Sequence, residues 1–281
     1  MLRYWKIYYI MSQKESFRRQ RFTGERLTYD LLHPTPRGLL QIRKELGSSP
    51  FGVIEIAQSH VQRYLFAERI ISENQGDTPS RVLDIASGVG YVSSILSTGN
   101  RIVTAVDLHG PSVREALHFY PSINGGVVAD GQYLPFDDAS FEFAVSFETF
   151  EHVPNPNLFL SELSRVLKPS GQVILSTPNR DVSNPRAQIS DKPHNSFHEF
   201  EMSHGEFREA LEAVFPDVKL FGQNQIRAQD SKLRSRALTM GIPGRIGVRM
   251  CDLASIKKRS SVGPSVEEYV PTYMIAVCSN G

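Results

Sequence analysis

A glycine-containing turn flanked by acidic residues is the part of this sequence best suited to bind a small polar ligand. The stretch R-V-L-D-I-A-S-G-V-G-Y covers residues 81–91 and joins an apolar run of strand character to a helical pattern. Gly88 and Gly90 have no Cβ, so a ligand can lie directly against the backbone of the turn. Unpaired N–H groups at the start of the following helix would point towards that ligand.

Acidic residues near the turn indicate which ligand it binds. A nicotinamide-binding turn typically reads G-x-G-x-x-G, but Ser93 stands at the third glycine position. Asp84 lies within the strand, where its charge would repel a phosphate and attract an ammonium group. Asp107 ends the next strand-like run, R-I-V-T-A-V-D, at the spacing where a ribose diol is bound. An amine and a ribose without a phosphate describe S-adenosylmethionine, which we predict as the cofactor.

Five motifs, in order along the chain, resemble those of class I S-adenosylmethionine-dependent methyltransferases. They are V-L-D-I-A-S-G-V-G-Y, A-V-D-L, A-D-G-Q-Y-L-P-F-D-D-A-S-F, S-F-E-T-F-E-H-V and S-R-V-L-K-P-S-G-Q-V-I-L-S-T-P-N. The similarity runs from about Gly24 to Gln223. The later stretch H-N-S-F-H-E-F-E resembles a loop of the bacterial methyltransferase type 11 branch, which is often associated with saccharide biosynthesis.

This resemblance, together with the two acids above, implies a set of cofactor contacts. Asp130 would accept a hydrogen bond from the adenine amino group, although it could instead form a turn before Gly131. Arg63 would bind the methionine carboxylate, or else be a surface charge of its helix. The complete predicted set is Arg63, Asp84, Ala86, Ser87, Gly88, Gly90, Asp107, Leu108, Asp130, Gly131 and Phe147.

Two histidines are candidate general bases. Methyl transfer is an in-line displacement, so the enzyme has to align the acceptor and remove its proton. His152 follows the predicted fourth strand and is the first candidate, although it could instead orient its loop. His198 is the second candidate, with Glu201 placed to orient it. His194 and His204 lie nearby without an established metal-ligand spacing, so no metal is predicted.

Strand and helix patterns alternate from residue 81 onwards. This alternation favours a mostly parallel sheet with helices on both faces, and ligands bind beyond the carboxyl ends of such strands. The resemblance implies an α/β, Rossmann-like fold with seven strands, of which the last, 272–278, is antiparallel. The other expected strands are 81–86, 101–107, 126–130, 141–149, 171–178 and 218–223, and the expected helices are 90–98, 111–119, 156–168 and 203–215.

We divide the chain into an N-terminal arm, a helical cap and a catalytic domain. The arm, 1–23, is predicted to be flexible, although its aromatic start could instead touch a membrane surface. The cap, 24–76, contains a helix expected to turn Ile56, Val61, Leu65 and Ile70 inwards. The catalytic domain, 77–281, carries a basic insertion at 224–264, which is either a lid over an anionic acceptor or a solvated loop.

Composition narrows the partners and the compartment. The 31 basic and 30 acidic side chains give no global field that would recruit nucleic acid or an anionic membrane. Cys251 and Cys278 are too few for a disulfide framework, and no apolar run could span a bilayer, which favours the cytoplasm. We therefore expect a small-molecule or saccharide acceptor and no nucleic acid, while the sequence does not indicate the oligomeric state.

These patterns predict a methyltransferase that uses S-adenosylmethionine to O-methylate a saccharide, a nucleotide-sugar or another small hydroxylated acceptor. Two alternatives stay open. The chain could be a cofactor-binding scaffold or regulatory partner without catalysis. It could also be a nicotinamide-dependent reductase, which would have to hold a pyrophosphate beside Asp84.

Overall fold

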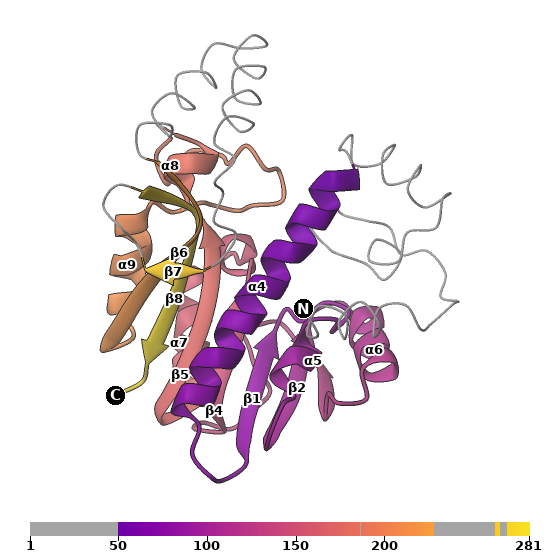
Figure 1. Ribbon diagram of the computed structural model, residues 1–281. Coiled ribbons are helices and arrows are strands. Elements are labelled where there is room, and N and C mark those ends of the chain that lie inside the picture. The colour runs from indigo at the N-terminus through magenta and orange to yellow at the C-terminus, as the bar shows by residue number, and fades with distance from the viewer. Residues whose placement is uncertain (1–49, 186, 228–261, 265–268) are drawn as a thin grey trace.

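The computed structural model describes residues 50–185, 187–227, 262–264 and 269–281 (Figure 1). The predicted arm, the start of the predicted cap and most of the basic insertion lie outside the described residues. Within the described part, no helix combines the length and the apolar character needed to cross a bilayer.

One sheet organises the molecule, with its strands in the order β3-β2-β1-β4-β5-β8-β6-β7. The first five of these strands are parallel, and β8 lies antiparallel between β5 and β6. The predicted fold is confirmed, with the two-residue β7 added at one edge. The bounds are β1 Ser80–Ile85, β2 Arg101–Asp107, β3 Gly125–Val128, β4 Phe141–Phe147, β5 Leu167–Pro178, β6 Asp217–Arg227, β7 Gly263–Pro264 and β8 Tyr269–Ser279.

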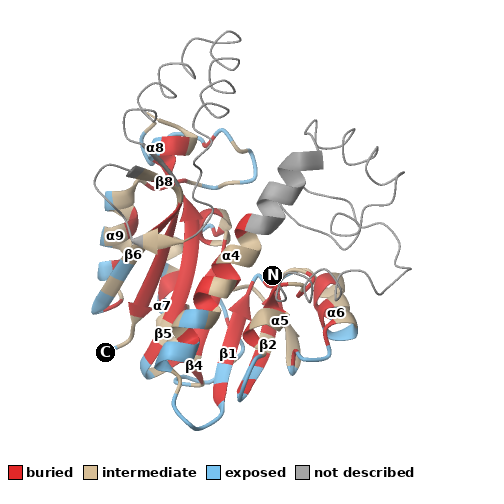
Figure 2. Ribbon diagram, in the orientation of Figure 1, coloured by how far each residue is buried: buried red, intermediate tan, exposed pale blue. Residues whose placement is uncertain are grey.

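Helices cover both faces of this sheet (Figure 1). Successive residues of a strand point to opposite faces, so a strand covered on both sides needs apolar residues throughout. In β1, Val82 packs on the side of α4 and Leu83 on the side of α7 and α9, and Figure 2 shows the central strands buried. The helices are α4 Pro50–Asn74, α5 Ser93–Leu96, α6 Gly110–Phe119, α7 Pro156–Val166, α8 Arg180–Ser183 and α9 His204–Glu212, with the 3-10 helix η1 at Phe150–His152.

The most deeply buried residues of helix α4 are not the ones that its apolar spacing predicted. Tyr64, Ala67 and Ile71 are buried in the core, whereas Val61 and Ile70 are only partly buried. The prediction holds in part, because Val61 and Ile70 pack against the core and Leu65 is half-buried, while the side chain of Ile56 lies outside the described part. Apolar residues lie on more than one side of this helix, so spacing alone did not select the most buried side. The buried side joins the same core as β1, β4, β5 and β8, and the division into cap and catalytic domain stays a prediction.

The order of the strands places the functional residues. From β1 the chain passes outwards to β2 and β3, and then returns to pair β4 with the other side of β1. Such a reversal leaves a crevice beyond the carboxyl ends of β1 and β4, which is where open α/β sheets bind ligands.

Candidate active site

A cavity of about 1570 Å³ opens at the carboxyl ends of β1, β2, β4 and β5, where it is lined by Ile85, Asp107, Phe147 and Pro178. A pocket for one small ligand typically measures about 300–1,000 Å³. The cavity bounded by the described residues therefore has room for two molecules.

The glycine loop after β1 forms one side of the cavity. Ala86, Gly88 and Gly90 have φ angles of 58°, 57° and 73°, so the loop bends back through the left-handed region. A Cβ on Gly88 would meet nothing within 4 Å, whereas one on Gly90 would lie 2.7 Å from the Cβ of Ala116. Gly88 thus faces open space beside the cavity, and Gly90 allows the loop to pack closely against α6.

The N–H groups of the loop are used within the protein, which differs from the sequence expectation. Ser87 N–H donates to the carbonyl of Val106 at 3.0 Å, and Gly90 N–H donates to the carbonyl of Ser87 at 3.1 Å. Helix α5 begins only at Ser93 and is four residues long, rather than spanning 90–98. The loop therefore contributes to the cavity mainly through its curved backbone and small side chains, and less through unpaired N–H donors.

Asp107 lines the cavity at the end of β2 and holds the glycine loop. Its Oδ2 accepts a hydrogen bond from Gly88 N–H at 2.9 Å, and its Oδ1 accepts one from His109 N–H at 2.8 Å. Carboxylate oxygens can accept more than one hydrogen bond each. The same side chain can thus fix the loop and still accept bonds from a diol.

Asp84 lies beneath the loop and does not line the cavity. It is fully buried, and the Tyr64 hydroxyl donates to its Oδ1 at 2.9 Å. Burial raises the pKa of Asp84 to about 7, against the opposing effect of the Tyr64 hydrogen bond. The structure therefore places this carboxyl in a supporting layer, where its charge can act on a ligand only through the loop.

Arg63 of α4 is buried at the cavity wall, 1% exposed, so it is not a surface helix charge. Its Nε donates to Gln223 Oε1 at 2.8 Å, its Nη1 lies 3.6 Å from Glu148 Oε1, and its guanidinium stacks 4.5 Å from the centre of the Tyr273 ring. Nη1 makes no hydrogen bond within the described part of the chain. A buried donor in this state is costly unless a ligand supplies an acceptor.

The remaining predicted cofactor residues also line the cavity. Asp130 forms a turn in which its Oδ1 accepts the Gln132 N–H at 2.9 Å, and this carboxylate also faces the cavity. Gly131 is required by packing, because a Cβ there would lie 2.7 Å from the Phe159 ring. Leu108 is 69% exposed although apolar. All the predicted cofactor residues except Asp84 and Gly90 line the cavity.

The two candidate histidines come together on the opposite side of the cavity. His152 ends η1 after β4, His198 lies in the loop before α9, and their ring centres are 5.0 Å apart. His152 Nδ1 lies 2.8 Å from the carbonyl oxygen of Phe197, which can only accept, so Nδ1 carries the proton.

His198 is held by a carboxylate. Its Nδ1 lies 2.6 Å from Glu201 Oε1, and its Nε2 accepts a hydrogen bond from Asn195 Nδ2 at 3.0 Å. Burial alone would raise the pKa of Glu201, but hydrogen bonds from His198 and Ser183 outweigh it and hold that pKa below its usual value. A carboxylate at Nδ1 fixes the tautomer and makes Nε2 more basic.

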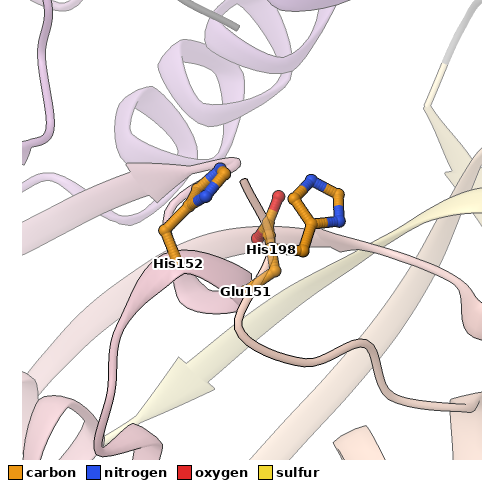
Figure 3. Close-up of side chains that lie close together, drawn as sticks. All are labelled: Glu151, His152 and His198. Atoms are coloured by element: carbon orange, nitrogen blue, oxygen red, sulfur yellow. The ribbon is translucent and has the colours of Figure 1, made fainter. Parts of the chain in front are cut away.

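Glu151 lines the cavity and was not singled out by the sequence analysis. It is 1% exposed, and its Oε2 accepts a hydrogen bond from Thr177 at 3.1 Å. Burial and the nearby charge of Glu148 raise the pKa of Glu151 well above its usual range. Its carboxyl lies between the two imidazole rings, as Figure 3 shows. The only signal in the sequence was its position directly before His152.

Comparisons with known proteins agree with this architecture. Residues 83–175 match the family model described as "Methyltransferase domain". A Mycobacterium tuberculosis protein named "Probable S-adenosylmethionine-dependent methyltransferase" is 34% identical over 146 residues, which are 52% of this chain and 52% of that relative. A ubiquinone biosynthesis O-methyltransferase of Pseudomonas aeruginosa is 32% identical over 126 residues, 42% of this chain and 52% of that relative. The chain thus spans about half the length of the curated relatives it matches.

Solved structures share the fold. A methyltransferase of Haloferax volcanii, solved with the Trm112 methyltransferase activator, superposes with a TM-score of 0.54 at 19% identity, over 80% of this chain and 93% of that one. A Thermotoga maritima S-adenosylmethionine-dependent methyltransferase gives 0.52 at 17% identity, over 79% and 91%. Residues 83–175 therefore resemble a methyltransferase domain, and the sheet order supports a fold of the class I S-adenosylmethionine-dependent methyltransferases, to which this chain is similar.

Proposed function

We propose that this chain transfers a methyl group from S-adenosylmethionine to a hydroxyl oxygen of a small acceptor. One observation supports this most directly: a single cavity has the glycine loop and Asp107 on one side and Glu151, His152 and His198 on the other. The first side suits a nucleoside, and the second suits a group that must lose a proton.

The described residues fit the cofactor. Arg63 Nη1 is buried and makes no hydrogen bond within the described part of the chain, although Glu148 lies 3.6 Å away, and a guanidinium suits the carboxylate of the methionine part. Asp107 offers acceptors to a ribose diol, and Asp130 offers one to the adenine amino group. The exposed apolar side chain of Leu108 would be covered by the flat adenine ring. S-adenosylmethionine, when bound, supplies an activated methyl group on a positively charged sulfur.

An oxygen acceptor is favoured by the histidine side of the cavity. A hydroxyl is a weak nucleophile until its proton is removed or its charge is stabilised, and two imidazoles beside a carboxyl can do either. The name of the Pseudomonas aeruginosa relative also specifies O-methylation, of that protein. Apolar side chains also line the cavity: Val153, Pro154, Pro178 and the half-exposed Phe197. They favour an acceptor with an apolar or aromatic body. A saccharide acceptor is the second candidate, and the turnover assay below tests both.

Cofactor titration and a turnover assay test the proposal. Calorimetric titration of the full chain with S-adenosylhomocysteine should show binding, and NADH should show none. Arg63→Ala should weaken the affinity by about 10–150-fold, because it removes a charge-assisted contact. Arg208→Ala is the matched control, since Arg208 pairs with Glu212 on an exposed helix surface and should leave the affinity unchanged.

Turnover separates the enzyme from its alternatives. Radiolabelled methyl donor should label at least one member of a panel of phenols, catechols, sugars and nucleotide-sugars. Cofactor binding without transfer to any acceptor would favour the scaffold, and NADH binding in place of S-adenosylhomocysteine would favour the reductase. The cytoplasm remains the compartment we propose, on the cysteine content alone.

A further inference from the structure

Helix α8 lies next to the carboxylate that holds His198. The helix begins two residues after the end of β5 and consists of Arg180–Ser183. The Ser183 hydroxyl donates to Glu201 Oε2, and Arg180 Nη1 donates to the Glu201 backbone carbonyl at 3.0 Å. Glu201 Oε1 is the atom that lies 2.6 Å from His198 Nδ1. Side chains of α8 thus contact the two acceptor groups of Glu201 that His198 does not use.

The place of α8 is fixed by three other elements. Asn179, which precedes the helix, donates from Nδ2 to the Pro271 carbonyl of β8 at 3.0 Å. Arg180 donates its backbone N–H to the Met202 carbonyl at 2.9 Å, and its Nη2 to Glu206 of α9 at 2.8 Å. A helix of four residues is not stable alone, so these contacts hold it in position. The Ser183 hydroxyl is therefore presented to Glu201 by the tertiary fold.

The hydrogen bond from Ser183 affects the charge of Glu201. This side chain is 4% exposed, and a buried carboxylate is costly unless hydrogen-bond donors compensate it. Burial would raise the pKa of Glu201, but hydrogen bonds from His198 and Ser183 outweigh it and hold that pKa below its usual value. Within the described part of the chain, Ser183 is the only side chain that donates to Oε2. Loss of the hydroxyl would therefore raise the pKa of Glu201.

We propose that Ser183 is a positioning residue for methyl transfer, whose hydroxyl holds the Glu201 carboxylate against His198 so that the imidazole takes the acceptor's proton at Nε2. An ionised Glu201 can only accept from Nδ1–H, which leaves Nε2 without a proton. A protonated Glu201 would donate to Nδ1 instead and place the ring proton on Nε2, where it blocks the reaction. The catalytic role rests on the proposed function, whereas the contact between Ser183 and Glu201 does not.

The step that Ser183 supports balances as follows. The acceptor hydroxyl replaces the Asn195 amide at His198 Nε2 and gives its proton to that nitrogen. The hydroxyl oxygen forms a bond to the methyl carbon as the carbon–sulfur bond breaks, and the electron pair of that bond returns to sulfur. The ionised Glu201 stabilises the imidazolium, which then releases its proton to water. The products are the methyl ether, S-adenosylhomocysteine and one proton.

Other charged and titratable groups also face the pair of Glu201 and His198. They come from η1, from α8 and from the loop between α8 and α9, and they are Glu151, His152, Arg180 and His194. All of them are retained when only the Ser183 hydroxyl is removed. A change in the titration of Glu201 in that variant is therefore due to the lost hydrogen bond.

A carboxyl titration tests the contact without reference to turnover. Full chain carrying ¹³C at the glutamate carboxyl carbons is titrated by NMR, and the Glu201 signal is the one lost in Glu201→Gln. In Ser183→Ala the pKa of Glu201 should rise by at least about one unit, because a hydrogen bond to the charged form is lost. Ser183→Thr keeps the hydroxyl and should titrate like the native chain. An identical titration of Glu201 in Ser183→Ala and the native chain would overturn the proposal.

A matched control removes a serine hydroxyl elsewhere in the fold. Ser164 of α7 donates to Asn280 Oδ1 at 2.6 Å and does not line the cavity. Ser164→Ala should therefore leave both the Glu201 titration and the turnover unchanged. A shift of the Glu201 titration in Ser164→Ala as large as that in Ser183→Ala would also overturn the proposal, because it would show a general loss of structure.

Turnover tests the catalytic part of the proposal. Ser183→Ala should lower kcat about tenfold or more, while KM for the acceptor and the affinity for S-adenosylhomocysteine stay within about twofold. Ser183→Thr should recover at least about half of the native kcat. Unchanged kcat in Ser183→Ala, or equal losses in Ser183→Ala and Ser183→Thr, would overturn the positioning role and leave the methyltransferase standing. A native chain that methylates no acceptor would instead contradict the proposed function, and the carboxyl titration would still decide the contact.

Discussion

We propose that the cofactor binds to the glycine-loop side of the cavity and the acceptor to the histidine side, and these two sides, the cofactor side and the acceptor side, are built by different means. On the cofactor side, a short loop with left-handed backbone at Ala86, Gly88 and Gly90 creates the shape, and Asp107 from the adjacent strand fixes it. On the acceptor side, the cavity is shaped by side chains rather than by backbone conformation. Glu151 and His152 lie next to His198, which comes from a loop distant in the sequence. The first side is therefore set by local backbone conformation, and the second depends on the tertiary fold.

The largest effect is expected on the acceptor side. His198→Ala should lower turnover by about 10²–10⁴-fold, the usual contribution of a residue that assists proton removal. Its affinity for S-adenosylhomocysteine should stay within about twofold, because no predicted cofactor contact is lost. Steady-state assays with radiolabelled methyl donor and parallel calorimetry measure both. Equal losses of turnover and affinity would mean that the two sides are not separate.

Asp84 lies beneath the glycine loop, and its ionisation should change the stability of the folded chain with pH. Burial raises its pKa from an ordinary value of about 3.8 to about 7, so between these values the folded state binds a proton that the unfolded state has released. Its contribution to stability is complete below pH about 4 and is lost as the pH rises through about 7. Asp84→Asn should therefore gain stability over the native chain as the pH rises, by up to about 4 kcal/mol.

Chemical unfolding of the ligand-free chain between pH 4 and pH 8 measures this difference. Parallel pH profiles for the native chain and the variant would show that Asp84 is ionised throughout. Asp84 would then have to contact a positive charge that the present account does not include.

The two glycines of the loop should respond differently to the same substitution. Both Gly88→Ala and Gly90→Ala place a Cβ at positive φ. Gly90→Ala also forces that Cβ against Ala116, and such overpacking costs about 1–3 kcal/mol more. Thermal unfolding of both variants compares them. A larger loss of stability in Gly88→Ala than in Gly90→Ala would contradict the assignment of the close packing to Gly90.

Asp107→Ala should weaken the affinity for S-adenosylhomocysteine by about 1–3 kcal/mol, because ribose hydroxyls would lose their acceptor. Asp107→Asn keeps one acceptor oxygen, so its affinity for S-adenosylhomocysteine should lie between those of Asp107→Ala and the native chain. Calorimetric titration gives all three values. Native affinity in Asp107→Ala would mean that the ribose binds elsewhere in the cavity.

The same contrast explains what the sequence could and could not predict. The strands, the parallel order and the loop follow from local patterns, and most predicted cofactor residues line the cavity. The prediction of a helix over 90–98 was wrong, because α5 begins only at Ser93 and ends at Leu96. Gly90 packs against α6 and does not line the cavity, so its contact with the cofactor stays a prediction.

The acceptor side was harder to predict for a physical reason. His152 and His198 were each singled out, but only the fold brings their rings together. Glu151 was overlooked because nothing in the sequence says that η1 turns its carboxyl inwards. Arg63 was placed by resemblance, and its burial against Gln223 and Tyr273 depends on strands far along the chain.

A crystal soaked with S-adenosylhomocysteine tests the central claim most directly. The account predicts the ribose hydroxyls at Asp107, the carboxylate at Arg63, and the sulfur directed towards Glu151, His152 and His198. A glycine loop without the nucleoside, or a nucleoside whose sulfur points away from the histidines, would contradict it.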